Sequence, residues 1–176
     1  MYEDTYDATL LFQGDIIDNI EFYLYPFNSI QDCETQKPSE EPHKEIFKKD
    51  YSIKHAITYT NIGIILSQNC DIDNRKFILL APVFPVSKRY PNNNNHLIDL
   101  RKHRINYEIH LPHIKNLPES FADLQLIVPY YKEKINLANR IAVLSIYGRS
   151  LLQQHLRDFF GRVEISLYIQ TEQGSS

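Results

Sequence analysis

The sequence predicts a mainly β domain, an antiparallel barrel with one helix packed on it near the C-terminus. Three observations lead to this prediction. The chain holds six or more short segments that are apolar or that alternate between apolar and polar residues, as strands do. One helical stripe of apolar residues stands out late in the chain. The regular alternation of strands and helices that a parallel sheet requires is missing.

The length and composition fit a single globular domain over residues 1–176. Hydrophobic residues make up 43% of the chain and charged residues 23%, which is ordinary for one buried core at this length. No segment approaches the roughly 20 apolar residues of a membrane-spanning helix, and the acidic start MYEDTYDATL differs from the basic start of a signal peptide.

Cysteine and histidine usage favours a cytoplasmic protein without a metal or cofactor. Cys33 and Cys70 are the only cysteines, which indicates free thiols in a reducing compartment and not disulfides or a zinc site. Four histidines follow no ligand spacing on any expected element, so we expect them on the solvated surface: His43, His103, His110 and His113.

Two strands are expected ahead of a long polar insertion. Residues 10–17 (LLFQGDII) and 21–27 (EFYLYPF) have the composition of neighbouring strands. Residues 28–57 are rich in Pro, Glu and Lys, which predicts a loop or a partly ordered insertion. Residues 1–50 contain 12 acidic and 4 basic residues, whereas the rest of the chain contains 10 acidic and 15 basic ones. The first 50 residues, which include most of the insertion, are therefore acidic, and the rest of the chain is mildly basic.

The polar segment between the next two expected strands has several interpretations. Residues 62–68 and 76–84 are rich in Ile, Leu and Val and predict buried strands. Asp and Asn between them favour a hairpin turn, because their side chains bond the nearby backbone. Cys70 as a nucleophile is disfavoured by the neighbouring carboxylate, and a calcium loop is disfavoured by Arg75. The remaining interpretation is the rim of a ligand groove, formed by Gln68, Asn69, Cys70, Asp71 and Asp73.

A basic stretch follows, from Ser87 to Arg104. Its cations would attract phosphates, since releasing counterions from nucleic acid favours binding; the alternative is a solvated loop. The candidate contacts are Lys88, Arg89, Arg101 and Arg104. Within the stretch, PNNNN at 91–95 predicts a loop tip. Residues 105–111 alternate at every step, which predicts a strand with one buried face.

The last third of the chain predicts two more strands, the helix and an edge strand. Residues 124–131 and 141–145 are the strands. The helix begins after Ser145, or after Ser150 with Gln153 completing a capping box. Its C-terminal cap is Gly161, and its apolar stripe consists of Leu151, Leu152, Leu156, Phe159 and Phe160. Residues 162–170 alternate as an edge strand would, and 171–176 form a polar tail.

Six short motifs follow one another along the chain in an order that resembles that of a known family. They are GDI at 14–16, IGIILS at 62–67, LLAPVFPVSKR at 79–89, NYEIHL at 106–111, FADLQLIV at 121–128 and LSIYGRSLLQQHL at 144–156. In this order the chain resembles the PemK/MazF-type toxins, small SH3-like barrels of bacterial toxin–antitoxin systems. The resemblance covers residues 10–161. It implies an SH3-like antiparallel barrel, here with a long acidic insertion loop and an extra edge strand.

The resemblance also implies an activity. Members of this family are homodimeric, metal-independent endoribonucleases that cut single-stranded RNA and are silenced by an antitoxin peptide. Such cleavage needs a base for the ribose 2'-hydroxyl and a cation for the transition state. The family's Arg before the strand at 62–67 is missing here, and so is its Ser or Thr after Pro82. Relocated residues would then serve, with Asp123 or Asp71 as the base and Arg89 or Arg140 as the cation.

We therefore expect a divergent member that acts as a binding module in a toxin–antitoxin or phage-defence system. Its rim would contact a protein partner or single-stranded RNA, and the chain would form a homodimer if it follows the family. The alternative is a metal-independent endoribonuclease with relocated residues. In a third interpretation, the acidic insertion covers the groove as a mimic of nucleic acid.

Overall fold

The computed structural model describes residues 1–3, 6–24, 57–91 and 93–161. Nearly all of the predicted insertion, the predicted edge strand at 162–170 and the tail lie outside the described residues, as does Cys33. The chain divides into two compact units, one formed by Met1–Ile20 with Asn61–Ser176 and the other by Glu21–Thr60. In the smaller unit, the rings of Phe22 and Tyr59 stack with their centroids 5.5 Å apart. The larger unit holds every site considered below.

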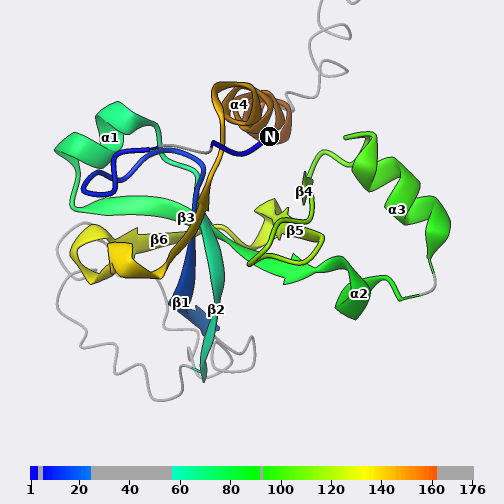
Figure 1. The fold of residues 1–176 in the computed structure, drawn as a ribbon, viewed down its shortest axis with the longest axis horizontal. Helices are drawn as coiled ribbons and strands as arrows, with labels where there is room; N and C mark the ends of the chain where they lie inside the picture. The colour runs from blue at the N-terminus through cyan, green and yellow to red at the C-terminus, as the bar shows by residue number, and fades with distance from the viewer. Residues whose placement is uncertain (4–5, 25–56, 92, 162–176) are drawn as a thin grey trace, which may run out of the picture. The chain divides into compact units, whose positions relative to one another are not determined.

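The strands form one curled, mainly antiparallel sheet, a half-barrel (Figure 1). Their order across the sheet is β4-β5-β3-β2-β1-β7, and β6 also pairs with β3. All the strand pairs with a described register are antiparallel. The strands are β1 (Asp15–Leu24), β2 (Ile57–Ile65), β3 (Phe77–Pro85), β4 (Glu108–Leu111), β5 (Ser120–Asp123), β6 (Val128–Tyr131) and β7 (Arg140–Val143).

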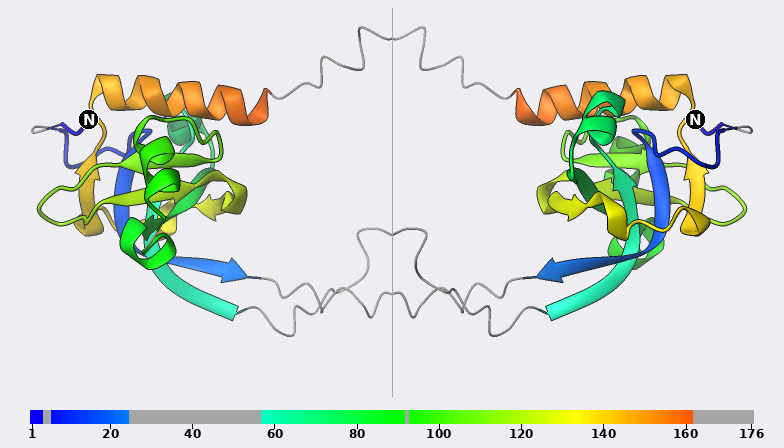
Figure 2. Two further views of the ribbon diagram at one scale, coloured as in Figure 1. Left: turned by 90° about the vertical axis from the view of Figure 1, so that its right-hand side faces the viewer. Right: turned by 90° about the vertical axis from the view of Figure 1, so that its left-hand side faces the viewer.

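In the described part of the chain, three α-helices and three short 3₁₀ turns lie between these strands, and a fourth helix, α4, follows β7. Figure 1 shows α1 and the α2–α3 pair on opposite sides of the sheet, and Figure 2 shows α4 lying across one end of the strands. The helices are α1 (Asn69–Asn74), α2 (Val86–Arg89), α3 (Asn94–Arg101) and α4 (Ile146–Phe160), and the turns are η2 (Leu124–Leu126), η3 (Lys132–Lys134) and η4 (Leu137–Asn139). No helix in the described ranges is long and apolar enough to cross a membrane.

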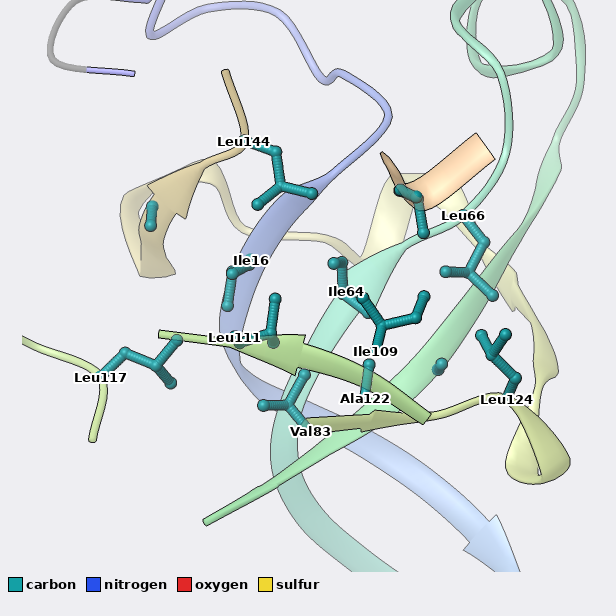
Figure 3. Close-up of a cluster of buried hydrophobic side chains, with 13 residues drawn as sticks. Ile16, Ile64, Leu66, Val83, Ile109, Leu111, Leu117, Ala122, Leu124 and Leu144 are labelled. Atoms are coloured by element: carbon teal, nitrogen blue, oxygen red, sulfur yellow. The ribbon is translucent and has the colours of Figure 1, made fainter. Parts of the chain in front are cut away.

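The main core lies inside the curl of the sheet, where side chains from six strands and α4 meet. Figure 3 shows them converging from β1 to β5. Burying them removes apolar surface from water, the dominant stabilising contribution to folding. The cluster consists of Ile16, Ile64, Leu66, Ala81, Val83, Ile109, Leu111, Leu117, Ala122, Leu124, Ala142, Leu144 and Leu152. A smaller cluster lies against α2 and α3 and consists of Val86, Leu100, Ile105 and Phe121.

The first two predicted strands are in fact one. β1 runs unbroken through Asp18 and Asn19, which look like a turn in the sequence. Asn19 takes a φ of +60°, a conformation that Asn tolerates better than most residues, and the register with β7 shifts between Ile16 and Ile17. Residues 10–14 precede the strand, and Gly14 turns the chain into it at φ +85°. A Cβ atom at this position would lie 2.9 Å from the side chain of Leu144.

Three local predictions also need correction. Residues 94 and 95 open α3 and are not a loop tip, because the Asn93 side chain caps the helix by accepting from the His96 backbone. All four residues of β4 are buried, so the strand has no solvated face. The expected strand at 124–131 contains η2 first and begins only at Val128.

The predicted C-terminal helix is confirmed. Ser145 is its N-cap and accepts from the Gly148 backbone, while Gly161 is the C-cap. The Ser150 hydroxyl instead donates to the Ile146 carbonyl within the helix. Of the predicted stripe, Leu152 is fully buried, whereas Phe160 is 63% exposed and does not belong to the core.

Candidate functional site

A polar groove with a volume of about 540 Å³ lies between α1 and α4. Both helices and the loop before β1 contribute side chains to it. We call it the α1–α4 groove; it is lined by Gln13, Gln68, Asn69, Cys70, Ile146, Arg149, Ser150 and Gln153.

Gln13 ties together the three segments that line this groove. Its backbone N–H donates to Asn69 Oδ1 over 2.9 Å, and its side-chain amide donates to the Leu66 carbonyl over 2.7 Å. Its Oε1 accepts from Gln153 Nε2 over 2.9 Å. Gln13 is only 3% exposed. These bonds therefore replace the hydrogen bonds to water that its amide loses on burial. The groove therefore has a fixed floor.

The start of the chain holds the first turn of α4. The Ser145 N–H donates to the Met1 carbonyl over 2.8 Å, and Arg149 pairs with Glu3 over 2.7 Å. Gly148 makes this approach possible, because a Cβ there would lie 2.5 Å from the Met1 carbonyl oxygen. Arg149 is the one charged side chain among the described lining residues. Since it pairs with Glu3, its charge is already balanced.

The predicted rim is divided by the structure. The segment between β2 and β3 is a short helix and not a tight turn. Gln68, Asn69 and Cys70 line the groove, and the Cys70 thiol donates weakly to Gln68 Oε1 over 3.9 Å. The groove lining includes neither Asp71, which pairs with Arg75 over 2.9 Å, nor Asp73, which is exposed.

A second polar site is formed by two buried carboxylates on neighbouring strands. Glu108 and Asp123 are cross-strand partners in the β4–β5 register and are almost inaccessible to water. We call this group, with its neighbours Arg89, Tyr90 and His96, the buried carboxylate cluster.

Each carboxylate in the cluster has its own partners. The Tyr90 hydroxyl donates to Glu108 Oε1 over 2.5 Å, and His96 Nε2 lies 3.0 Å from Glu108 Oε2. Arg89 donates to Asp123 Oδ2 over 2.9 Å, while the Gln125 backbone donates to Oδ1. Such mutual hydrogen bonds are what buried charges require.

The environment of the cluster shifts the pKa values of two of its members. Burial first, and then the hydrogen bond and the charge of Glu108, raise the pKa of the Tyr90 hydroxyl well above its usual range. Burial opposes the charged form of Arg89, but neighbouring Tyr90, Asp123 and Glu108 outweigh it and raise the pKa of the guanidinium. At neutral pH Tyr90 therefore stays protonated and donates a hydrogen bond to Glu108, and Arg89 is a cation.

The structure unites two of the four candidate catalytic residues. Asp123 and Arg89 form the ion pair just described. Asp71 is in an exposed pair elsewhere. The Arg140 side chain is 3% exposed and pairs over 3.0 Å with Asp15, whose pKa burial raises to about 6. Arg140 also donates to the carbonyls of Asp7 and Leu10, so it anchors the loop before β1.

Nothing in the sequence singles out Glu108 or His96 as a site residue. Glu108 sits at a polar position of the alternating stretch 105–111, where a solvated face was expected. Its burial was not predictable because α2 and α3, which carry Tyr90 and His96 over it, were interpreted as a loop.

The basic stretch is less positive than its sequence indicates. Arg89 pairs with Asp123, Arg101 with Glu119 and Arg104 with Asp99, at 2.9, 2.7 and 3.4 Å. Lys88 is exposed. Since each Arg contacts a carboxylate, its attraction for phosphates is reduced.

Two histidines expected on the surface are part of a cluster. His103 and His110 lie near His155 of α4, and His110 and His155 are buried, whereas His113 is exposed. Within the described ranges, no group of three or more His, Cys, Asp or Glu side chains is arranged to hold a metal ion.

Comparison with known proteins leaves the family open. No family model matches the chain, and no similar sequence is found among curated proteins. The PemK/MazF-type assignment therefore stays a prediction that rests on the order of motifs. What the structure establishes is the coarser class, a mainly antiparallel half-barrel with a C-terminal helix.

Proposed function

We propose that the chain is a divergent, PemK/MazF-like SH3-type barrel whose α1–α4 groove binds a segment of a partner protein. The partner would be an antitoxin or another component of a bacterial toxin–antitoxin or phage-defence system in the cytoplasm. The order of sequence motifs supports the family, and the chemistry of the groove supports the kind of ligand.

One observation carries this proposal: Ile146 lines the groove and is 75% exposed. Its neighbour Tyr147 is 72% exposed. Adjacent large apolar side chains left in water often mark a protein interaction site. The amides around them donate and accept hydrogen bonds as an extended peptide backbone does.

The charge of the groove favours a peptide over RNA. RNA binding depends largely on cations that contact phosphates, and Arg149 already pairs with Glu3. A neutral amide surface beside apolar side chains matches a peptide with an apolar anchor.

The test compares two exposed residues of the same helix. Ile146→Ser removes the apolar wall of the groove, and Phe160→Ser removes a similarly exposed side chain at the other end of α4. Partners captured from bacterial cells by cross-linking would be identified, and their affinities measured with purified proteins. We expect Ile146→Ser to weaken binding by about tenfold or more, about 1.4 kcal/mol, and Phe160→Ser to leave it unchanged. Equal effects of both variants would contradict the proposal.

A second candidate is metal-independent RNA cleavage at the buried carboxylate cluster. The observation that favours it is the position of His96. Its side chain is 22% exposed, is bonded by its Nε2 to Glu108, and packs on Tyr90 with the ring centroids 4.0 Å apart. A carboxylate that accepts from Nε2 fixes the tautomer whose Nδ1 carries the lone pair, as a general base requires.

This candidate changes the predicted base. Asp123 is 2% exposed and engaged by two donors, so His96 replaces it in the role. His96 would take the proton of the ribose 2'-hydroxyl as this oxygen attacks phosphorus, the bond to the 5'-oxygen would break, and solvent would protonate the leaving oxygen. Arg89, 41% exposed, would stabilise the phosphorane-like transition state.

Cleavage is tested with unstructured RNA in EDTA. We expect discrete cuts with 2',3'-cyclic phosphate ends, lost on His96→Ala and kept on His113→Ala. Intact RNA would remove this candidate and leave the binding module.

A further inference from the structure

Three histidines from three parts of the chain meet beside α4. His155 of α4 is 5% exposed, and its Nε2 lies 3.3 Å from Nδ1 of His103, which follows α3. The rings of His103 and His110, on β4, lie 6.2 Å apart. We call His103, His110 and His155 the histidine cluster. It connects α4 to both α3 and the sheet.

His103 is held in an unusual backbone conformation. Its φ of +54° is in the left-handed region, which is uncommon for residues other than glycine. Its N–H donates to the Leu100 carbonyl over 3.0 Å. A strained position of this kind persists where the surroundings fix it, often because the side chain has a function. Here the strained turn directs the imidazole at α4.

The carboxylates around the cluster are already engaged. Glu119, just before β5, lies 2.9 Å from His110 Nε2 and accepts two bonds from Arg101 of α3, each of 2.7 Å. Asp158, on α4 itself, has a half-exposed side chain and pairs loosely with Arg157. Among the residues that the structure describes, a proton on His103 or His155 would therefore meet another imidazole and no buried counter-charge.

The two histidines in contact accordingly favour their neutral form. Burial first, and then the neighbouring His110, lower the pKa of His103. Burial first, and then His103, lower the pKa of His155, against a smaller opposite effect of Asp158. A lowered histidine pKa means that the contribution to stability is complete above the unfolded value of about 6.5 and is lost as the pH falls below it.

The same helix forms one wall of the groove. Gln153, two residues before His155, reaches Gln13 in the groove floor. Leu152 is fully buried in the core between these contacts and the first turn. If the His103–His155 contact breaks, the second half of α4 loses its polar connection to α3, and Gln153 is displaced with it.

We infer that the histidine cluster is a pH-sensitive contact that keeps α4 against α3 and the sheet when His103 and His155 are neutral and releases the helix when they are protonated. Its link to ligand binding rests on the proposed function of the α1–α4 groove. The contact itself does not, because it concerns only the packing of α4.

The test measures urea unfolding midpoints of the full chain between about pH 7.5 and about pH 5.5, the range in which histidine titrates. His155→Leu replaces the buried imidazole by an apolar side chain that does not titrate. His103→Asn keeps a residue that tolerates a positive φ, and serves if the buried variant does not fold. His113→Gln is the control, since His113 is exposed.

We expect the urea midpoint of the wild type to fall on acidification by at least about twice as much as the midpoint of His103→Asn or His155→Leu. The reason is that each variant removes the His103–His155 contact, whose contribution to stability depends on pH. The His113→Gln protein should behave as the wild type. Equal falls in all four proteins would overturn the inference, and so would a His113→Gln effect as large as that of His103→Asn.

Partner affinity at the two pH values separates this inference from the proposed function. A partner bound about tenfold more weakly at the lower pH by the wild type, and equally at both pH values by His103→Asn, would support both. If the midpoints differ as expected but Ile146→Ser leaves partner binding intact, the pH-sensitive contact stands and the groove proposal fails. If the midpoints do not differ, the inference fails whatever the groove binds.

Discussion

The α1–α4 groove and the buried carboxylate cluster are both rich in polar side chains, yet they are built in opposite ways. In the cluster, carboxylates from β4 and β5 are covered by α2 and α3 and bond to Arg89, Tyr90 and His96. In the groove, neutral amides from α1 and α4 face an open space next to the exposed Ile146. Charges that satisfy each other chiefly hold elements together, whereas amides and apolar groups left open are available to a ligand.

The largest expected effect is on the cluster. Glu108→Ala removes the acceptor shared by Tyr90 and His96 and should lower the free energy of unfolding by about 3 kcal/mol, since breaking a buried, hydrogen-bonded set leaves its partners unpaired. Denaturant titration measures this. Glu133→Ala is the control, because Glu133 is exposed and accepts from the exposed hydroxyl of Tyr131. A loss no larger than that of the control would mean that the cluster does not support the fold.

The next largest loss of stability is expected at the floor of the groove. Gln13→Ala leaves the Leu66 carbonyl and the Gln153 amide without their partner, and should cost about 2 kcal/mol of unfolding free energy. It should also weaken partner binding, since α4 loses its hydrogen bond to the groove floor, although the bond from the backbone of residue 13 to Asn69 remains. Gln125→Ala is the control because the Gln125 side chain is exposed. Full stability with Ala at position 13 would show that the groove needs no fixed floor.

Acid unfolding tests the contacts of Glu119 with Arg101 and His110, beside the histidine cluster. The hydrogen bond from Arg101 lowers the pKa of Glu119 to about 2, helped by that from His110 and opposed by burial. A lowered carboxyl pKa gives stability that is present above the unfolded value and is lost as the pH falls toward 2. We expect Glu119→Gln to lose less stability than the wild type on acidification below about pH 4.5. Parallel curves for the two proteins would refute this, and Glu133→Gln provides the comparison.

The smallest effect on stability is expected where the effect on function is greatest. Ile146→Ser changes an exposed side chain, so its unfolding free energy should stay within about 0.5 kcal/mol of the wild type. Thermal unfolding checks this. A much larger loss would show that Ile146 packs in the fold, and the loss of partner binding in this variant would then have a structural cause.

The sequence predicts the class of fold but not the way its polar residues are covered. A continuous apolar run identifies β3, and periodicity identifies β4 and α4 because their apolar residues repeat at strand or helix spacing. It fails at Asp18 and Asn19, where turn-forming residues lie within a continuous strand. It fails again at Asn94, because the cap formed by the Asn93 side chain turns a run of asparagines into the start of a helix.

The sites show the same limit. Gln68, Asn69 and Cys70 could be singled out because a dense polar segment interrupts two buried runs. The opposite wall of the groove could not be singled out. Arg149 and Gln153 lie on a helix whose apolar stripe already accounts for its sequence by packing on the core. Arg89 and Asp123, 34 residues apart in the chain, were named separately, and only the fold brings them into contact.

The pairing of β1 with β7 has a consequence for how the chain folds. Asp15 pairs with Val143, and Tyr2 forms a bridge with Leu144, so the first strand finds this neighbour only after β2 to β6 have been synthesised. Contacts so distant in sequence slow folding, because much chain entropy is lost before they form. On the ribosome, one edge of β1 would stay open while most of the remaining strands emerge, and it is during this interval that the nascent chain is most exposed to wrong strand pairing.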